Sequence, residues 1–183
     1  MTRLSCYTIF LAFLVISCSS DIHWQEKLGS LLHDYGHRNW IVIADYAYPC
    51  QSSEGIETIY TGQEHLEVLD YVLEQTEYAP HVSAVIMIDR ELGFLSEEDA
   101  PGIGDYRSNL ENRLGKREVS TMPHEKIISR LDASSELFNV LVLKTNMVLP
   151  YTSVFIELDC GYWDAEKEKR LRDAMNTSSK DPS

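Results

Sequence analysis

Three continuous runs of apolar residues constrain the fold of this chain more than any other feature. They are WIVIADYA (residues 40–47), VSAVIMID (82–89) and FNVLVLKT (138–145). Such runs are typical of strands that are covered on both faces, as in sheets with helices on each side. Two shorter stretches, at 116–122 and 151–159, predict further strands.

Amphipathic stretches alternate with these strands. Residues 23–35 and 62–76 repeat leucine, valine and aromatic residues at helical spacing, Pro123 begins a later helix, and residues 164–176 predict a charged terminal helix. The acidic segment 96–115 predicts a loop and a surface helix. Strands that alternate with helices indicate an α/β fold with a central, mainly parallel sheet flanked by helices. In such folds, loops at strand ends are the usual place for a ligand.

The composition supports one globular domain and excludes some classes of partner. Hydrophobic residues make up 44% of the 183 residues, which is enough for a core. The formal net charge is -13. An acidic protein lacks the basic face that nucleic-acid binding needs, and it does not dock electrostatically on anionic lipid. We therefore expect no nucleic-acid partner.

The N-terminus has the pattern of an export signal. Arg3 precedes an apolar run at 7–16, which as a helix is about 15 Å long and too short for a ~30 Å hydrocarbon core. The ending VISC resembles the lipobox of bacterial lipoproteins. We expect a signal peptide over 1–17, lipidation of Cys18 and a tether over 18–22. An ordinary cleaved signal or a membrane-anchor helix is the alternative. Lipidation predicts an exported protein of the bacterial cell envelope, facing the periplasm or the surface and anchored through lipid only.

Two cysteines remain in the expected mature chain, Cys50 and Cys160. An exported compartment permits a disulfide between them, and two separate buried thiols are the alternative. His33 and His37 have the i,i+4 spacing of a helical metal pair, but Gly36 interrupts that helix and no third ligand follows. The chain also has no CxxC motif and no glycine-rich phosphate loop. We therefore expect no metal and no cofactor.

The first apolar strand lies between polar residues at a distinctive spacing. YGH precedes the strand, Asp45 follows eight residues after His37, and Pro49 follows four residues later. Further along the chain, MPHEKI begins a helix with His124, and PYTS (150–153) precedes the last strand.

These motifs, in this order, resemble the ribose pyranase / fucose mutarotase (RbsD/FucU) family over roughly residues 24–163. The family domain is expected at 23–163, and the charged helix and loose tail at 164–183 are additional. The family interconverts ring or anomeric forms of free sugars without a cofactor. The resemblance therefore implies a monosaccharide ligand such as ribose, fucose or galactose. Family members assemble into closed rings with sites at subunit junctions, so it also implies a homo-oligomeric ring.

The resemblance also implies roles for individual residues. His37 matches the catalytic histidine, usually described as the proton donor, and Asp45, His124, Tyr151 and Ser153 match substrate-contacting positions. Opening a hemiacetal needs one proton delivered to the ring oxygen and one removed from the anomeric hydroxyl. Imidazole suits this chemistry because its unperturbed pKa of ~6.5 is close to working pH.

Two features depart from the family pattern. Ser153 stands where the family has asparagine, and a hydroxyl cannot donate and accept through two separate atoms as an amide can. The export signal is the second departure, because the familiar members are cytoplasmic. The alternative function is therefore a non-catalytic lipoprotein that binds sugar or serves assembly and keeps the fold.

Four of the site residues also have a structural interpretation. His37 could cap the carbonyl groups of the preceding helix, and Asp45 could be a turn residue bonded to its own backbone. His124 could be a surface residue of a first helical turn, and Tyr151 could be a packing residue at a strand edge. The interpretations differ in where they place each side chain.

Overall fold

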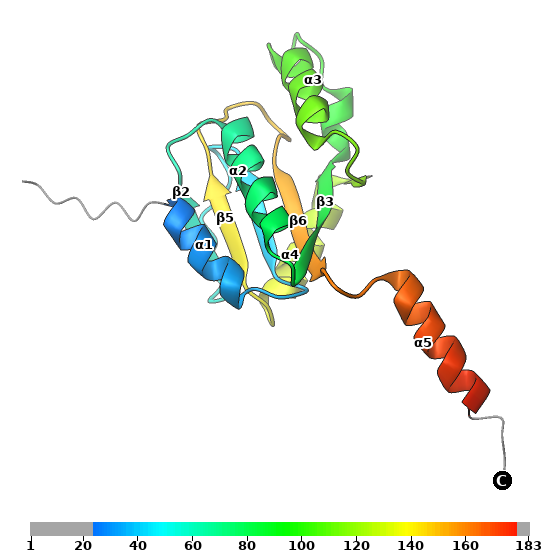
Figure 1. Ribbon diagram of the computed structural model, residues 1–183. Coiled ribbons are helices and arrows are strands. Elements are labelled where there is room, and N and C mark those ends of the chain that lie inside the picture. The colour runs from blue at the N-terminus through cyan, green and yellow to red at the C-terminus, as the bar shows by residue number, and fades with distance from the viewer. Residues whose placement is uncertain (1–23, 179–183) are drawn as a thin grey trace, which may run out of the picture.

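A computed structural model describes residues 24–178 as a six-stranded sheet with helices on both faces (Figure 1). The strands are β1 (Trp40–Ala44), β2 (Ile56–Tyr60), β3 (Val82–Asp89), β4 (Val119–Met122), β5 (Val140–Lys144) and β6 (Val154–Cys160). The helices are α1 (Trp24–Asp34), α2 (His65–Tyr78), the short 3-10 helix η1 (Arg90–Phe94), α3 (Ile103–Leu114), α4 (His124–Ser135) and α5 (Ala165–Ser178). The predicted signal peptide, Cys18 and the tether to residue 22 lie outside the described residues, as do residues 179–183.

The strand order is β2-β5-β1-β6-β3-β4, and β6 alone among the described strands runs antiparallel to its neighbours. The predicted α/β fold with a mainly parallel sheet is therefore confirmed. The three apolar runs become β1, β3 and β5, and every residue of β1 is buried. Because β6 is reversed, its first residues lie beside the carboxyl ends of the other strands. We call this end of all the strands the carboxyl edge of the sheet, as distinct from the outermost strands β2 and β4.

Helices α1, α2 and α3 cover one face of the sheet. Their core residues pack with sheet residues in one large cluster that includes Leu28, Leu69, Leu110, Ile41 and Ile156. These side chains are almost fully withdrawn from water, which is the main favourable contribution to folding.

Helix α4 covers the opposite face. Its residues Ile127 and Leu131 pack with the sheet residues Trp40, Val42 and Phe155. Burial on both faces explains why the central strands read as continuous apolar runs instead of an alternating pattern.

Strand β2 is not predicted by the sequence. Its five residues, IETIY, pair in parallel with β5 at one edge of the sheet, and each is partly or fully exposed. An edge strand with polar residues in its middle lacks the apolar run that identifies the central strands. Its partner is also distant in the sequence, so no local hairpin signal points to it.

Helix α5 projects away from the sheet (Figure 1). None of its described residues is buried, and the Trp163 indole just before the helix donates a hydrogen bond to Glu168. The helix corresponds to the charged helix expected at 164–176. Across residues 24–178, no helix has the length and apolar character needed to cross a membrane.

The structure corrects both expectations for the cysteines. Cys50 follows the carboxyl end of β1, whereas Cys160 ends the antiparallel strand β6, so the two lie at opposite edges of the sheet. Both are free, Cys50 is exposed and Cys160 is partly exposed. They neither pair within one chain nor form two buried thiols.

Candidate active site

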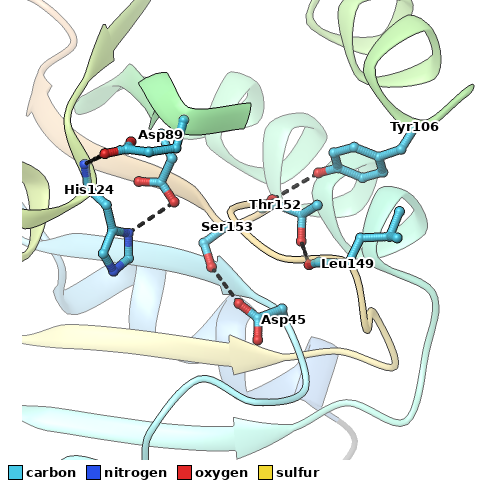
Figure 2. Close-up of polar contacts among 8 residues, drawn as sticks. Asp45, Asp89, Tyr106, His124, Leu149, Thr152 and Ser153 are labelled. Carbon is cyan, nitrogen blue, oxygen red and sulfur yellow. Dashed lines mark hydrogen bonds and ion pairs between the residues drawn. The ribbon is translucent and has the colours of Figure 1, made fainter. Parts of the chain in front are cut away.

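Chemically active side chains gather at the edge of the sheet where the parallel strands end (Figure 2). Asp45 follows β1, Asp89 is the last residue of β3, and His124 comes two residues after β4. Ser153 lies at the same edge because it immediately precedes the reversed strand β6. This position is the one where α/β sheets usually bind ligands.

Asp45 has both a turn role and a site role. Its Oδ1 accepts a hydrogen bond from the Ala47 backbone N–H at 2.8 Å, and its Oδ2 accepts one from Ser153 Oγ at 3.3 Å. The first bond closes the turn that the structural interpretation predicts. The second hydrogen bond comes from Ser153, which is only 2% exposed. Ser153 therefore lies behind Asp45 and holds its carboxylate, and Asp45 itself lines a pocket.

His124 is held at two points by carboxylates. Its Nδ1 lies 3.0 Å from Oδ2 of Asp89, and its backbone N–H donates to both carboxylate oxygens of Glu91, at 3.0 and 3.2 Å. As the first residue of α4, it has a backbone N–H without a partner inside the helix, and Glu91 supplies one. The ring packs edge-on against Tyr151, with 5.7 Å between ring centroids.

Asp89 is a site residue that the sequence analysis did not identify. Its side chain is 1% exposed, and its Oδ1 has no hydrogen-bond partner among the described residues. Burial raises the pKa of Asp89 to about 6, and the His124 ring beside it acts in the opposite direction. The signal was present in the sequence, because the run VSAVIMID ends in an aspartate as WIVIAD does.

A pocket of about 540 Å³ opens beside these residues. Asp45, His124 and Tyr151 line it, together with Tyr48 and several apolar side chains. The Tyr48 hydroxyl is buried without a partner among the described residues, and burial raises its pKa. A mostly apolar wall with a few convergent polar groups is the usual construction of a small-molecule site.

Two hydrogen bonds, one from α3 and one within the loop, hold the loop before β6 (Figure 2). The Tyr106 hydroxyl of α3 donates to the Thr152 carbonyl at 2.8 Å, and the Thr152 hydroxyl donates to the Leu149 carbonyl at 2.8 Å. Tyr151 has a backbone φ of 55°, a left-handed conformation that is uncommon outside glycine. The strained residue lies at the pocket, where such conformations often accompany function.

His37 is not part of this pocket in a single chain. It lies before β1, at the opposite edge of the sheet from Asp45. Its side chain is 54% exposed, and Nδ1 is 4.0 Å from Oδ1 of Asp159. The predicted site residues therefore fall into two groups: Asp45, His124 and Tyr151 around the pocket with Ser153 behind it, and His37 apart.

The helix-capping role considered for His37 belongs to another histidine. Nε2 of His81 lies 2.9 Å from the Leu32 carbonyl and 3.1 Å from the Tyr35 carbonyl, at the end of α1. Among the described residues, His37 makes no hydrogen bond to these carbonyl groups. His37 is thus left free of a capping function.

His65 has a structural position in the core. Its Nε2 contacts the Ile43 carbonyl at 3.2 Å, and burial lowers its pKa to about 4. The ring is therefore neutral at physiological pH. Within residues 24–178, no group of three or more His, Cys, Asp or Glu side chains is arranged to hold a metal ion.

Comparison with known proteins identifies one family and several solved structures of similar fold. Residues 23–160 match the family model described as the RbsD / FucU transport protein family. Among solved structures, the chain is similar to RbsD of Bacillus subtilis complexed with D-ribose, at 18% identity and a TM-score of 0.51, covering 73% of this chain and 91% of that chain. It is also similar to the fucose mutarotase of Streptococcus pneumoniae in complex with L-fucose, at 23% identity and a TM-score of 0.49, covering 71% and 89%. No curated protein sequence matches the chain significantly.

Proposed function

The chain belongs to the RbsD/FucU family, and from this premise we propose that it is a mutarotase that interconverts anomeric or ring forms of a free monosaccharide. The observation that carries the proposal is the convergence of Asp45, His124 and Tyr151 on one pocket at the carboxyl edge of the sheet. The Bacillus subtilis relative was solved with D-ribose bound, which supports a free sugar as the ligand class.

The residues of the pocket suit a sugar. Asp45 can accept hydrogen bonds from sugar hydroxyl groups, and Tyr151 offers a hydroxyl and an apolar ring face. The imidazole of His124 can accept or donate a proton through its ring nitrogens. Acid–base chemistry of this kind draws only on side chains of the chain itself.

His37 enters the proposal through a second subunit. In one chain it lies at the far edge of the sheet, so it can serve the pocket only if another copy presents it there. A closed ring joins different surfaces of neighbouring subunits, so it can present His37 of one copy to the pocket of the next. We therefore extend the proposal to a homo-oligomer with shared sites.

Saturation-transfer NMR with ribose, fucose, galactose and glucose tests the activity directly, because it measures exchange between anomers at equilibrium. We expect exchange above the buffer rate with at least one sugar. His37→Asn should slow that exchange by about 10²–10⁴-fold, the usual contribution of general acid–base catalysis. Asparagine keeps a polar side chain but cannot carry the proton.

His33→Asn is the matched control, because His33 is also exposed near the end of α1 and does not line the pocket. It should exchange sugars at the wild-type rate. If the wild-type protein accelerates exchange of none of the four sugars, the mutarotase proposal fails. Sugar binding without exchange would then favour the non-catalytic alternative, with Ser153 in place of the family's asparagine as the first suspect.

We also propose export and lipid anchoring through Cys18, supported by the short apolar run and the VISC ending. Labelling of cells with a fatty-acid analogue should mark the wild-type protein and not Cys18→Ala. Equal labelling of both proteins would contradict the anchor.

A further inference from the structure

The two ring nitrogens of His124 have different surroundings. Nδ1 faces the buried Asp89 carboxylate at 3.0 Å. Nε2 has no hydrogen-bond partner among the described residues, and the ring lines the pocket. Figure 2 shows the second ring nitrogen pointing away from Asp89. One nitrogen is therefore occupied by the protein and the other is available to a ligand.

The sheet register produces this arrangement. Asp89 at the end of β3 pairs with Met122 at the end of β4. The chain then turns through Pro123 directly into His124, so the ring comes within reach of the neighbouring strand's last side chain. Glu91 binds the backbone N–H of the same residue. His124 is thus fixed at its main chain and at its side chain by separate carboxylates.

A purely structural purpose does not account for Asp89. A buried carboxylate is costly, and no described residue gives Oδ1 a hydrogen bond that could offset the cost. Glu91 and Asp45 lie close enough to add repulsion. An apolar residue at the end of β3 would fill this space at lower cost. A costly group in contact with a pocket histidine is more typical of a functional site.

We propose that Asp89 is a positioning residue that keeps the neutral His124 ring protonated on Nδ1, so that Nε2 accepts the proton of the anomeric hydroxyl. The inference rests on the proposed mutarotase function. A carboxylate can accept a hydrogen bond but cannot donate one, and so it selects the tautomer with the proton on the nitrogen that faces it.

The ring-opening step then balances. Nε2 takes the proton from the hydroxyl on the anomeric carbon, and the electron pair of that O–H bond forms the carbonyl. The bond between the anomeric carbon and the ring oxygen breaks, and its pair goes to the ring oxygen. The ring oxygen takes a proton from an acid, the role proposed for His37 of a second subunit. Closure on either face of the carbonyl reverses these transfers and returns the proton from Nε2.

Histidine ¹⁵N NMR of the purified full chain tests the positioning without any sugar. In wild type, the neutral His124 ring should carry its proton on Nδ1. In Asp89→Asn, whose amide can also donate, the fraction protonated on Nε2 should rise. His124→Asn identifies the signal. A wild-type ring protonated on Nε2 would overturn the inference whether or not the protein accelerates sugar exchange.

Kinetics test the consequence. Asp89→Asn should lower kcat for anomer exchange by at least about 10-fold and change KM far less, because the base acts in the transition state. Asp70→Asn, at an exposed ion pair with Arg113, should leave both constants unchanged. A structural role predicts instead that Asp89→Asn loses thermal stability and activity together at pH 7.5, and this result would overturn the inference. Exchange absent from wild type would contradict the proposed function, while the NMR result would still decide the positioning.

Discussion

Asp89 keeps a charge out of water, and the energetic cost appears in its pKa. Burial raises that pKa from the ordinary value of 3.8 to about 6. The folded state therefore holds this proton more tightly than the unfolded chain does. The stability that protonated Asp89 contributes to the folded state is fully present below about pH 4 and is lost as the pH rises through about 6.

Asp89→Asn should for this reason gain stability relative to wild type as the pH rises from about 4 to about 7. A difference of about two pKa units corresponds to about 3 kcal/mol in the free energy of unfolding. Urea unfolding followed by tryptophan fluorescence at several pH values measures the difference. His124, Glu91 and Asp45 also face Asp89, so Asp70→Asn provides the baseline for general pH effects. A difference between variant and wild type that does not change with pH would contradict the prediction.

Single residues were predictable from the sequence where a motif marked them. The family resemblance marked Asp45, His124 and Tyr151, and these three residues line one pocket. Asp89 lies outside every motif and becomes visible only through the register that places it beside His124. His81 likewise reaches the end of α1 through tertiary contacts that no local pattern encodes.

At the scale of elements, α5 differs from the other helices. None of its side chains from 165 to 177 is buried, and the ion pairs Glu166–Arg170 and Glu168–Arg172 lie along its own surface. Pairs of this kind add only a few tenths of a kcal/mol each to a helix. The matched family region ends at residue 160, before α5 begins.

Deletion of residues 165–183 should therefore leave the thermal midpoint of the domain within about 2 °C of the full chain. The physical reason is that the described part of the segment contributes nothing to either core cluster. Differential scanning calorimetry of the two proteins makes the comparison. A large fall in the midpoint would show that α5 packs against something, and concentration dependence would identify a second copy.

The central elements were predictable because burial on both faces leaves a strong signal. β3 begins and ends where the run VSAVIMID does, and α4 begins at the histidine after Pro123. β2 gives no comparable signal because only pairing with β5 makes it a strand. The reversed direction of β6 is likewise a property of the whole sheet, since an apolar run contains no information about orientation.

For the whole molecule, the separation of His37 from the pocket has a consequence that can be tested. If each working site takes His37 from one subunit and His124 from another, an assembly of only His37→Ala subunits has no complete site, and neither does one of only His124→Ala subunits. A mixed assembly of the two variants can do so. Random mixing of equal amounts should restore about one quarter of the sites. About half of the subunits carry His37, about half carry His124, and a working site needs the right subunit at both positions.

We therefore expect that His37→Ala and His124→Ala, each inactive alone, regain anomer exchange after they are unfolded together and refolded as a mixture. Mixing His37→Ala with the double variant His37→Ala/His124→Ala should restore nothing, since no subunit then offers His37. Light scattering before and after mixing reports the assembly. A mixture as inactive as its components, in an assembly shown to have exchanged subunits, would contradict the shared site.

The antiparallel direction of β6 also affects how this protein can change over evolutionary time. Because β5 ends and β6 begins at the same edge, the connecting segment 145–153 leaves the sheet and returns to it on the pocket side. Its start is tied to β1 through the bond from Thr145 N–H to the Ala44 carbonyl, and its end enters a buried strand. The bonds at Leu149 and Thr152 hold the part of the segment that carries Tyr151, whereas the exposed Val148, which also lines the pocket, can vary. Substitutions within this one short loop can therefore alter the pocket wall, while the six strands keep their pairing.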